Sequence, residues 1–327
     1  MKGYVIANAN AKGGIGKTTN SLGLSYALSH LGFNVLLIDG DPQASSTNDL
    51  CIDPDSCNTL DELIAPMVEA ELERYEDEGY AKASEYWNAI CEACYDWKRV
   101  SKFIYTPSYG RARQNGMKWE TIEVPFGDDL GKFDLIPSNI KLSIMDSKMG
   151  MASKYFGFIY TNYIYDLVSV IKQQDIYDYI ILDLPPQISA LSNNLLAAAT
   201  DGIVLCSNLD IQSIRGFDSI TDAISAVQNV NPEHRGVLGI LFSMYSERRT
   251  TDKSIEDIAK QYVPIPIFDT RIPETADVRK AYANGRLVNQ LNKKVKEAYT
   301  DLAKEIHYAM LYPDSPIGTN KKKAGNK

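Results

Sequence analysis

The chain of 327 residues is long for one domain but within the range of one large α/β sheet with an insertion. Hydrophobic residues make up 44% of it, enough for a sizeable core, and no run of 18 apolar residues predicts a transmembrane helix. The chain starts directly with a predicted strand, and its five cysteines are an odd number, so we expect a cytoplasmic protein in a reducing setting. A net charge of −8 argues against a nucleic-acid coat over the whole surface.

The charge is unevenly distributed along the chain. Residues 61–100 carry 11 acidic and 4 basic side chains, whereas residues 279–327 carry 4 acidic and 11 basic ones. Such asymmetry favours one face or tail for an anionic polymer. Solvated helix faces beside a disordered basic end explain the same counts, so charge alone leaves both readings open.

A glycine-rich loop at residues 9–19 follows a predicted strand at 4–7 and precedes a helical apolar pattern. Glycines let backbone N–H groups converge on an anion at the positive end of a helix. The predicted nucleotide-binding residues of this loop are Gly13, Gly14, Ile15, Gly16, Lys17, Thr18 and Thr19. We expect Lys17 to reach the β- and γ-phosphates of a nucleotide and Thr18 to hold Mg²⁺. A dinucleotide loop is the rival, because Asp39 lies where a ribose-binding acid belongs, but the Rossmann glycine spacing is absent.

Acidic residues follow two predicted buried strands. Asp39 and Asp41 come after the apolar run at 34–38, and Asp183 comes after the run at 179–182. Ligands bind at the carboxyl ends of strands in open α/β sheets, although a strand-end turn with helix-capping acids explains an isolated pair. We expect Asp183 to be a Walker B acid that accepts a hydrogen bond from a water on Mg²⁺, and Pro185 and Pro186 to stiffen a switch loop.

Lys12 opens the loop as Lys-Gly-Gly-Ile-Gly-Lys-Thr-Thr, which resembles the deviant Walker A motif of the ParA/MinD family. The resemblance implies that Lys12 crosses a dimer interface to the nucleotide of the other subunit. Residues 39–43 resemble the Asp-x-Asp-Pro-Gln motif of the family. By that resemblance Asp39 orients or activates the attacking water, and Asp41 supports the water shell of the metal. The expected catalytic residues are thus Lys12, Lys17 and Asp39, and the expected metal residues are Thr18, Asp41 and Asp183.

The second half of the chain predicts further buried strands at 133–136, 202–206, 236–243 and 264–268 and helices at 153–174, 210–228 and 288–311. After the strand at 236–243, the sequence resembles the ParA pattern in which an arginine–threonine pair contacts DNA phosphates. This resemblance assigns DNA contacts to Arg249 and its neighbour Arg248. Residues 270–273 resemble the nucleotide-base loop, which assigns Pro273 to the nucleotide. The next basic DNA contact of the family aligns with Asp277, and we expect Arg279 and Lys280 to replace it.

Residues 50–132 are the least readable part of the chain. They predict one or two amphipathic helices between 61 and 100 and then a polar, aromatic loop. We therefore expect one P-loop ATPase domain at 1–312 with a helical insertion at about 50–132, and a basic, disordered tail at 313–327. The insertion is either a dimer or partner surface or a local helical subdomain. Cys91 and Cys94 form a lone C-x-x-C pair, which offers a metal site only if two chains meet there.

The resemblance implies a doubly wound, mostly parallel α/β sheet of the P-loop class and a ParA-type partition ATPase. Such a protein uses ATP and Mg²⁺, closes a sandwich homodimer, binds double-stranded DNA non-specifically on the nucleoid, and is stimulated by a ParB-type centromere-binding partner. Strand one begins too early to leave room for a helix-turn-helix, which implies the short form.

Three other functions share the loop motif. A MinD-like membrane-cycling ATPase needs an amphipathic C-terminal helix that residues 318–327 lack, so we expect no membrane contact. A metal-dependent ATPase or reductase component rests on Cys91 and Cys94 alone. A tyrosine kinase needs a C-terminal tyrosine cluster, whereas the 20 tyrosines are dispersed.

Overall fold

The computed structural model describes residues 3–10, 12–50, 52–78, 94–107, 113–115, 118–120, 130–156, 162–209, 217–246, 248–283, 287, 290, 292–315 and 317. Its centre is a seven-stranded sheet of order β5-β2-β6-β1-β7-β8-β9 in which every strand pair is parallel. The strands are β1 (Tyr4–Ala9), β2 (Val35–Asp39), β5 (Phe133–Ile136), β6 (Tyr179–Asp183), β7 (Gly202–Ser207), β8 (Val237–Tyr245) and β9 (Ile267–Pro273). The predicted doubly wound α/β fold is confirmed.

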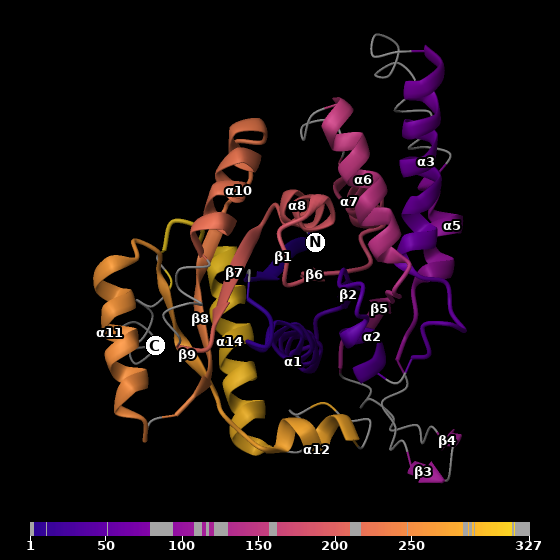
Figure 1. Ribbon diagram of the computed structural model, residues 1–327. Helices are drawn as coiled ribbons and strands as arrows, with labels where there is room; N and C mark the ends of the chain where they lie inside the picture. Colours follow the sequence, from indigo (N-terminus) through magenta and orange to yellow (C-terminus); the bar gives the residue numbers. More distant parts are fainter. Residues whose placement is uncertain are drawn as a thin grey trace.

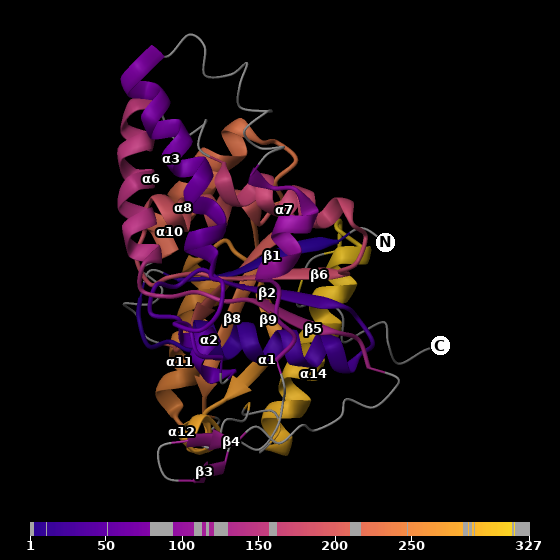
Figure 2. The same cartoon turned by 90° about the vertical axis from the view of Figure 1, so that its right-hand side faces the viewer.

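Helices cover both faces of this sheet (Figures 1 and 2). One face carries α1 (Lys17–His30), α2 (Ser45–Asp49), α12 (Asp277–Ala283) and α14 (Lys293–Leu311). The other carries α3 (Leu60–Glu78), α6 (Leu142–Phe156), α7 (Tyr163–Gln173), α8 (Ala190–Ala198) and α10 (Phe217–Val230), and α11 (Thr250–Tyr262) adds Ala259 to the same core. Because helices bury both faces, β2, β5, β6 and β7 are buried throughout, which explains the long apolar runs of β2, β6 and β7.

Gly23 allows α1 and α14 to pack closely against each other on one face of the sheet. A Cβ on Gly23 would lie 2.5 Å from the ring of Tyr299, so only glycine admits this ring. The Tyr299 hydroxyl donates to Asn20 Oδ1 at 2.8 Å, and Asn20 donates to Ser243 Oγ at 2.8 Å. These bonds tie α14 and β8 to the helix that starts at the glycine-rich loop.

The described part of the predicted insertion shares the core of the sheet. Along α3, the side chains of Leu60, Leu63, Ile64, Met67 and Val68 are completely buried and belong to the same cluster as the strands. In Figure 2, α3 and α6 run side by side above the sheet, and they are in contact. Shorter elements follow: α5 (Trp97–Val100), a 3₁₀ turn at Ser101–Phe103, and a separate hairpin of β3 (Arg113–Asn115) and β4 (Lys118–Glu120). The helix predicted between 61 and 100 is α3, and it is therefore part of the helical layer that covers this face of the sheet.

Two predicted helix boundaries are wrong. The structure starts α6 at Leu142, well before the predicted start at 153, and begins α7 at Tyr163. Leu142, Met145 and Met149 are buried at the i, i+3, i+7 spacing of a helix, a signal that the predicted start at 153 missed. The helix predicted at 288–311 is α14, which starts at Lys293 with Asn292 as its N-cap. Residues 157–161, 210–216 and 318–327 lie outside the described residues. In the described part, no helix is long and apolar enough to cross a membrane.

Candidate nucleotide-binding site

The glycine-rich loop turns through left-handed backbone before α1. Gly14 has φ +72° and Gly16 has φ +90°, conformations that glycine adopts without the cost a Cβ brings. α1 starts directly after Gly16, at Lys17, and its first turn holds no acidic residue. The loop therefore ends on the positive end of a 14-residue helix, which favours an anion there.

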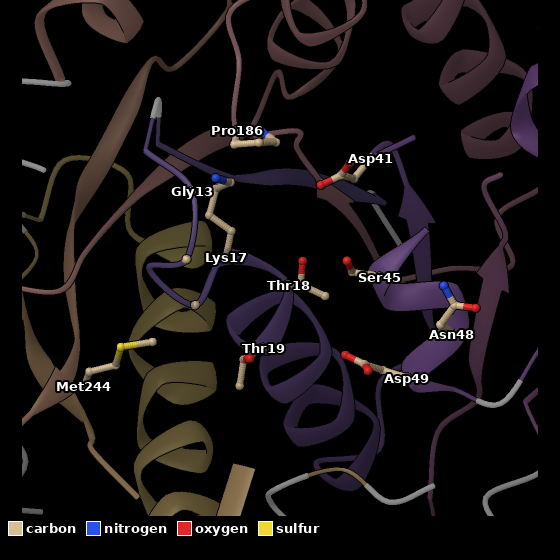
Figure 3. Close-up of a pocket in the computed structure, with 12 residues that line it drawn as sticks. Gly13, Lys17, Thr18, Thr19, Asp41, Ser45, Asn48, Asp49, Pro186 and Met244 are labelled. Carbon is tan, nitrogen blue, oxygen red and sulfur yellow. The ribbon is translucent and has the colours of Figure 1, made fainter. Parts of the chain in front are cut away.

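A cavity of about 480 Å³ opens beside this loop (Figure 3). Its volume lies in the range of small-molecule sites. The predicted residues that line it are Gly13, Gly14, Gly16, Lys17, Thr18, Thr19 and Asp41. Its other lining residues, which the sequence reasoning did not assign to the nucleotide, are Ser45, Asn48, Asp49, Pro186 and Met244. Figure 3 shows Thr18 and Ser45 facing each other between the loop and α2.

Lys17 is the buried cation of the cavity. Its side chain is 7% exposed, and Nζ donates to the backbone carbonyl of Lys12 at 3.0 Å. Burial lowers the pKa of Lys17, while the nearby charges of Asp183 and Asp41 act in the opposite direction. A cation held this way at the floor of an open cavity is suited to an anionic ligand such as a phosphate.

Asp39 and Asp183 are register partners on the adjacent strands β2 and β6, and both are completely buried. Asp39 Oδ2 accepts from the Thr47 amide at 2.8 Å and the Thr47 hydroxyl at 2.7 Å, and Oδ1 accepts from the Asp41 amide at 3.2 Å. Burial, and then the charge of Asp183, raise the pKa of Asp39 to about 8. Asp39 does not line the cavity, whereas Asp41 does. This geometry disagrees with the water-orienting role predicted for Asp39, because its oxygens are committed to Thr47 and Asp41.

Asp183 lies next to Thr18, which lines the cavity. Its oxygens accept from Ser21 Oγ at 3.0 Å and Ser46 Oγ at 2.8 Å, and the Thr18 hydroxyl lies close enough to help lower its pKa. Burial raises the pKa of Asp183, and these hydroxyl donors oppose that effect. The hydroxyl of Thr18 and the carboxylates of Asp41 and Asp183 are the hard oxygen donors that Mg²⁺ prefers, and few protein ligands suffice because phosphates supply the others.

The remaining predicted nucleotide residues lie outside the cavity lining. Ile15 is completely buried in the core between α1 and α14, so its side chain has a packing role. Lys12 is half-buried, and its amide donates to Asn10 Oδ1 at 2.8 Å. Pro273 ends β9, is half-buried and does not line the cavity. The role predicted for Lys12 involves a second subunit and stays a prediction.

The predicted DNA-binding cations lie near acids. Arg248 and Arg249 are exposed just before α11, and Arg249 forms an ion pair with Glu274. Lys280 on α12 is 71% exposed, with Nζ 3.5 Å from Asp277. The side chain of Arg279 lies outside the described residues, as does Cys91. Cys94 is half-buried, and no group of three His, Cys, Asp or Glu side chains that could hold a metal occurs in the described part.

The parallel sheet, the glycine loop entering α1 and the acids at the ends of β2 and β6 define a P-loop nucleotide-binding protein. Residues 6–288 match the CobQ/CobB/MinD/ParA nucleotide binding domain, and the chain belongs to that family.

Its relatives are distant in sequence but similar in length. It is 28% identical to the uncharacterized protein MJECL24 of Methanocaldococcus jannaschii over 91% of this chain and 96% of that one. It is 24% identical to the chromosome partitioning protein ParA of Caulobacter vibrioides over 92% and 93% of the two chains. Among solved structures, cobyrinic acid a,c-diamide synthase of Mycobacterium smegmatis with a bound ATP analog and magnesium is 21% identical, with a TM-score of 0.67 over 98% and 99% of the chains.

Proposed function

We propose that this protein is a ParA-type ATPase that binds ATP and Mg²⁺, dimerises, binds DNA without sequence preference, and segregates plasmid or chromosomal DNA. The observation that carries the nucleotide part is the cavity in which Lys17, Thr18 and Asp41 meet at the positive end of α1. The similarity to a chromosome partitioning protein supports the DNA part.

The residues divide the work of ATP hydrolysis between them. The loop amides and Lys17 hold the phosphates and neutralise the charge that develops on them. Thr18 and Asp41 would hold Mg²⁺, which would supply positive charge beside the phosphates, and Asp183 lies next to Thr18. Asp41 takes the water-orienting role first predicted for Asp39, because Asp41 lines the cavity and Asp39 does not. The half-buried Lys12 completes the site from the second subunit of an ATP-bound sandwich homodimer.

Dimerisation gives DNA binding its dependence on ATP. Each subunit contributes the exposed Arg248 and Arg249 before α11 and Lys280 on α12, with Arg279 beside it. Two copies double this basic surface, and phosphate contacts of this kind need no base readout. DNA binding keeps the ATP-bound dimer on the nucleoid in the cytoplasm, and a ParB-type partner then stimulates slow hydrolysis and releases the DNA.

The decisive measurement is binding to unrelated DNA duplexes with ATP, with ADP and without nucleotide, each titrated with salt. We expect binding only with ATP, equal for all sequences, with a log–log salt slope of about −5 if roughly six phosphates are contacted.

A charge-reversal variant tests whether Arg249 belongs to the DNA-binding surface. Arg249→Glu should abolish DNA binding and leave ATP-dependent dimerisation intact. Lys260→Glu is the matched control, because Lys260 is an exposed cation in the last turn of α11 and also pairs with a glutamate. Dimerisation with ATP but no DNA binding at low salt would refute the partition function.

A further inference from the structure

Helix α2 supplies the side chains that hold the two buried acids. It spans only Ser45–Asp49 and starts after Ala44, whose φ of +52° is unusual for a residue with a Cβ. Ser46 and Thr47, adjacent on this helix, are both completely buried. Ser46 donates to Asp183 on β6 and Thr47 donates to Asp39 on β2, so one short helix ties together two neighbouring strands.

The two serines on Asp183 differ in how firmly they are committed to it. Ser21 Oγ lies 3.0 Å from Asp183 Oδ1 but also 3.1 Å from the carbonyl of Lys17, and a hydroxyl has one proton to donate. Ser46 Oγ lies 2.8 Å from Asp183 Oδ2, and Asp183 is its only hydrogen-bond acceptor among the described residues. Ser46 is therefore the dedicated donor to this carboxylate.

We infer that Ser46 is a positioning residue of the magnesium site. This inference rests on the nucleotide part of the proposed function. With Oδ2 held by Ser46 at 2.8 Å, the carboxylate of Asp183 keeps its orientation beside Thr18, whose hydroxyl is near enough to influence the pKa of Asp183. Thr18 faces the cavity, so the hydroxyl of Ser46 acts on the metal through two intervening side chains without touching it. Groups that orient metal-binding residues in this way commonly change metal affinity by about 10- to 100-fold.

The test measures Mg²⁺ affinity separately from nucleotide affinity in the full-length chain. A fluorescent ADP analogue is titrated in EDTA and then, at fixed nucleotide, with Mg²⁺. We expect Ser46→Ala to raise the Mg²⁺ concentration at half-saturation about tenfold and to leave binding in EDTA unchanged. Ser46→Cys, which keeps a weaker donor at the same place, should give a smaller rise and serves if the alanine variant does not fold.

Ser25→Ala is the matched control. Ser25 is also a completely buried serine, and its hydroxyl donates to the backbone carbonyl of Ser21 at 2.7 Å, away from both acids. We expect no change in its Mg²⁺ titration. An unchanged Mg²⁺ midpoint in folded Ser46 variants, or an equal rise in Ser25→Ala, would overturn the inference. A wild-type protein whose ADP binding ignores Mg²⁺ would instead contradict the proposed nucleotide site itself.

Discussion

The nucleotide cavity and the basic surface around α11 and α12 hold their charges in opposite ways. In and beneath the cavity, Lys17 is buried, and Asp39 and Asp183 each accept several hydrogen bonds with no exposure to solvent. On the basic surface, Arg249 and Lys280 are exposed and lie beside Glu274 and Asp277. A buried charge is costly when a partner is removed, whereas an exposed ion pair contributes about 0–1 kcal/mol. Substitutions should therefore have large effects in the cavity and small, salt-dependent effects on the surface.

The largest effect should come from Lys17. We expect Lys17→Ala to weaken ATP binding by about 100-fold or more, because it removes the cation that faces the phosphates. Titration of a fluorescent ATP analogue measures this, with Lys132→Ala, which changes an exposed lysine before β5, as the control. Equal affinities of Lys17→Ala and wild type would contradict this contrast, because the buried cation of the cavity would then have no role in binding.

Substitutions of Asp41 and Asp39 should affect different properties: ATP hydrolysis for Asp41 and stability for Asp39. Asp41→Asn should lower kcat for ATP hydrolysis about 100-fold while ATP still binds, because Asp41 lines the cavity. Asp39→Asn should mainly lower Tm, because an amide cannot accept all the bonds that Thr47 and Asp41 donate to the carboxylate, at a cost of about 1–3 kcal/mol. If folded Asp39→Asn loses hydrolysis and Asp41→Asn keeps it, the role first predicted for Asp39 is correct after all.

The strands and the phosphate loop could be predicted because each obeys a strict physical constraint. A parallel strand covered on both faces must be apolar throughout, as in β2 and β6, and a loop that wraps an anion needs glycine at Gly14 and Gly16. That Asp41 lines the cavity while Asp39 is buried against Thr47 could not be predicted, because two acids two residues apart look alike until the donors from Thr47 are in place.

Helix α2 and the acidic partner of Arg249 escaped prediction for related reasons. Ser45–Asp49 is five polar residues with no apolar period, and its importance comes from contacts to β2 and β6, which are distant in the chain. Arginine at position 249 suggests a DNA contact, but its pairing with Glu274 depends on how β9 ends beside β8. Side chains that act through partners distant in sequence carry no local signal.

The stability of the protein should also depend on pH, through the buried acid Glu71. Glu71 on α3 is 7% exposed, accepts a hydrogen bond from the Tyr163 hydroxyl, and has its pKa raised to about 8 by burial. Since the folded state holds this proton more tightly than the unfolded state does, its contribution is complete below pH ~4.5 and is lost as pH rises towards 8. We expect Tm to fall over this window in wild type and to fall less in Glu71→Gln.

Burial also raises the pKa of Asp39, an effect common to wild type and Glu71→Gln, so the difference between the two Tm curves isolates Glu71. Glu69→Gln is the control, because Glu69 lies on the same helix, is 48% exposed, and pairs with Lys148. Its curve should follow that of wild type. Parallel curves for wild type and Glu71→Gln would show that Glu71 is ionised in the folded protein at neutral pH, and burial would then not be the dominant influence on this acid.

The smallest effect should come from the partner of Arg249. If Arg249 contacts DNA, Glu274 competes with phosphate for it, and Glu274→Gln should tighten ATP-dependent DNA binding about two- to fivefold at low salt. Glu233→Gln removes the same charge from an exposed glutamate before the start of β8, at the opposite end of that strand from the arginines. A gain in Glu274→Gln that exceeds the gain in Glu233→Gln and shrinks as salt is added places Arg249 at the phosphates. Equal gains mean that net charge alone is responsible, and no gain in either variant means that the exposed arginines before α11 are not the DNA surface.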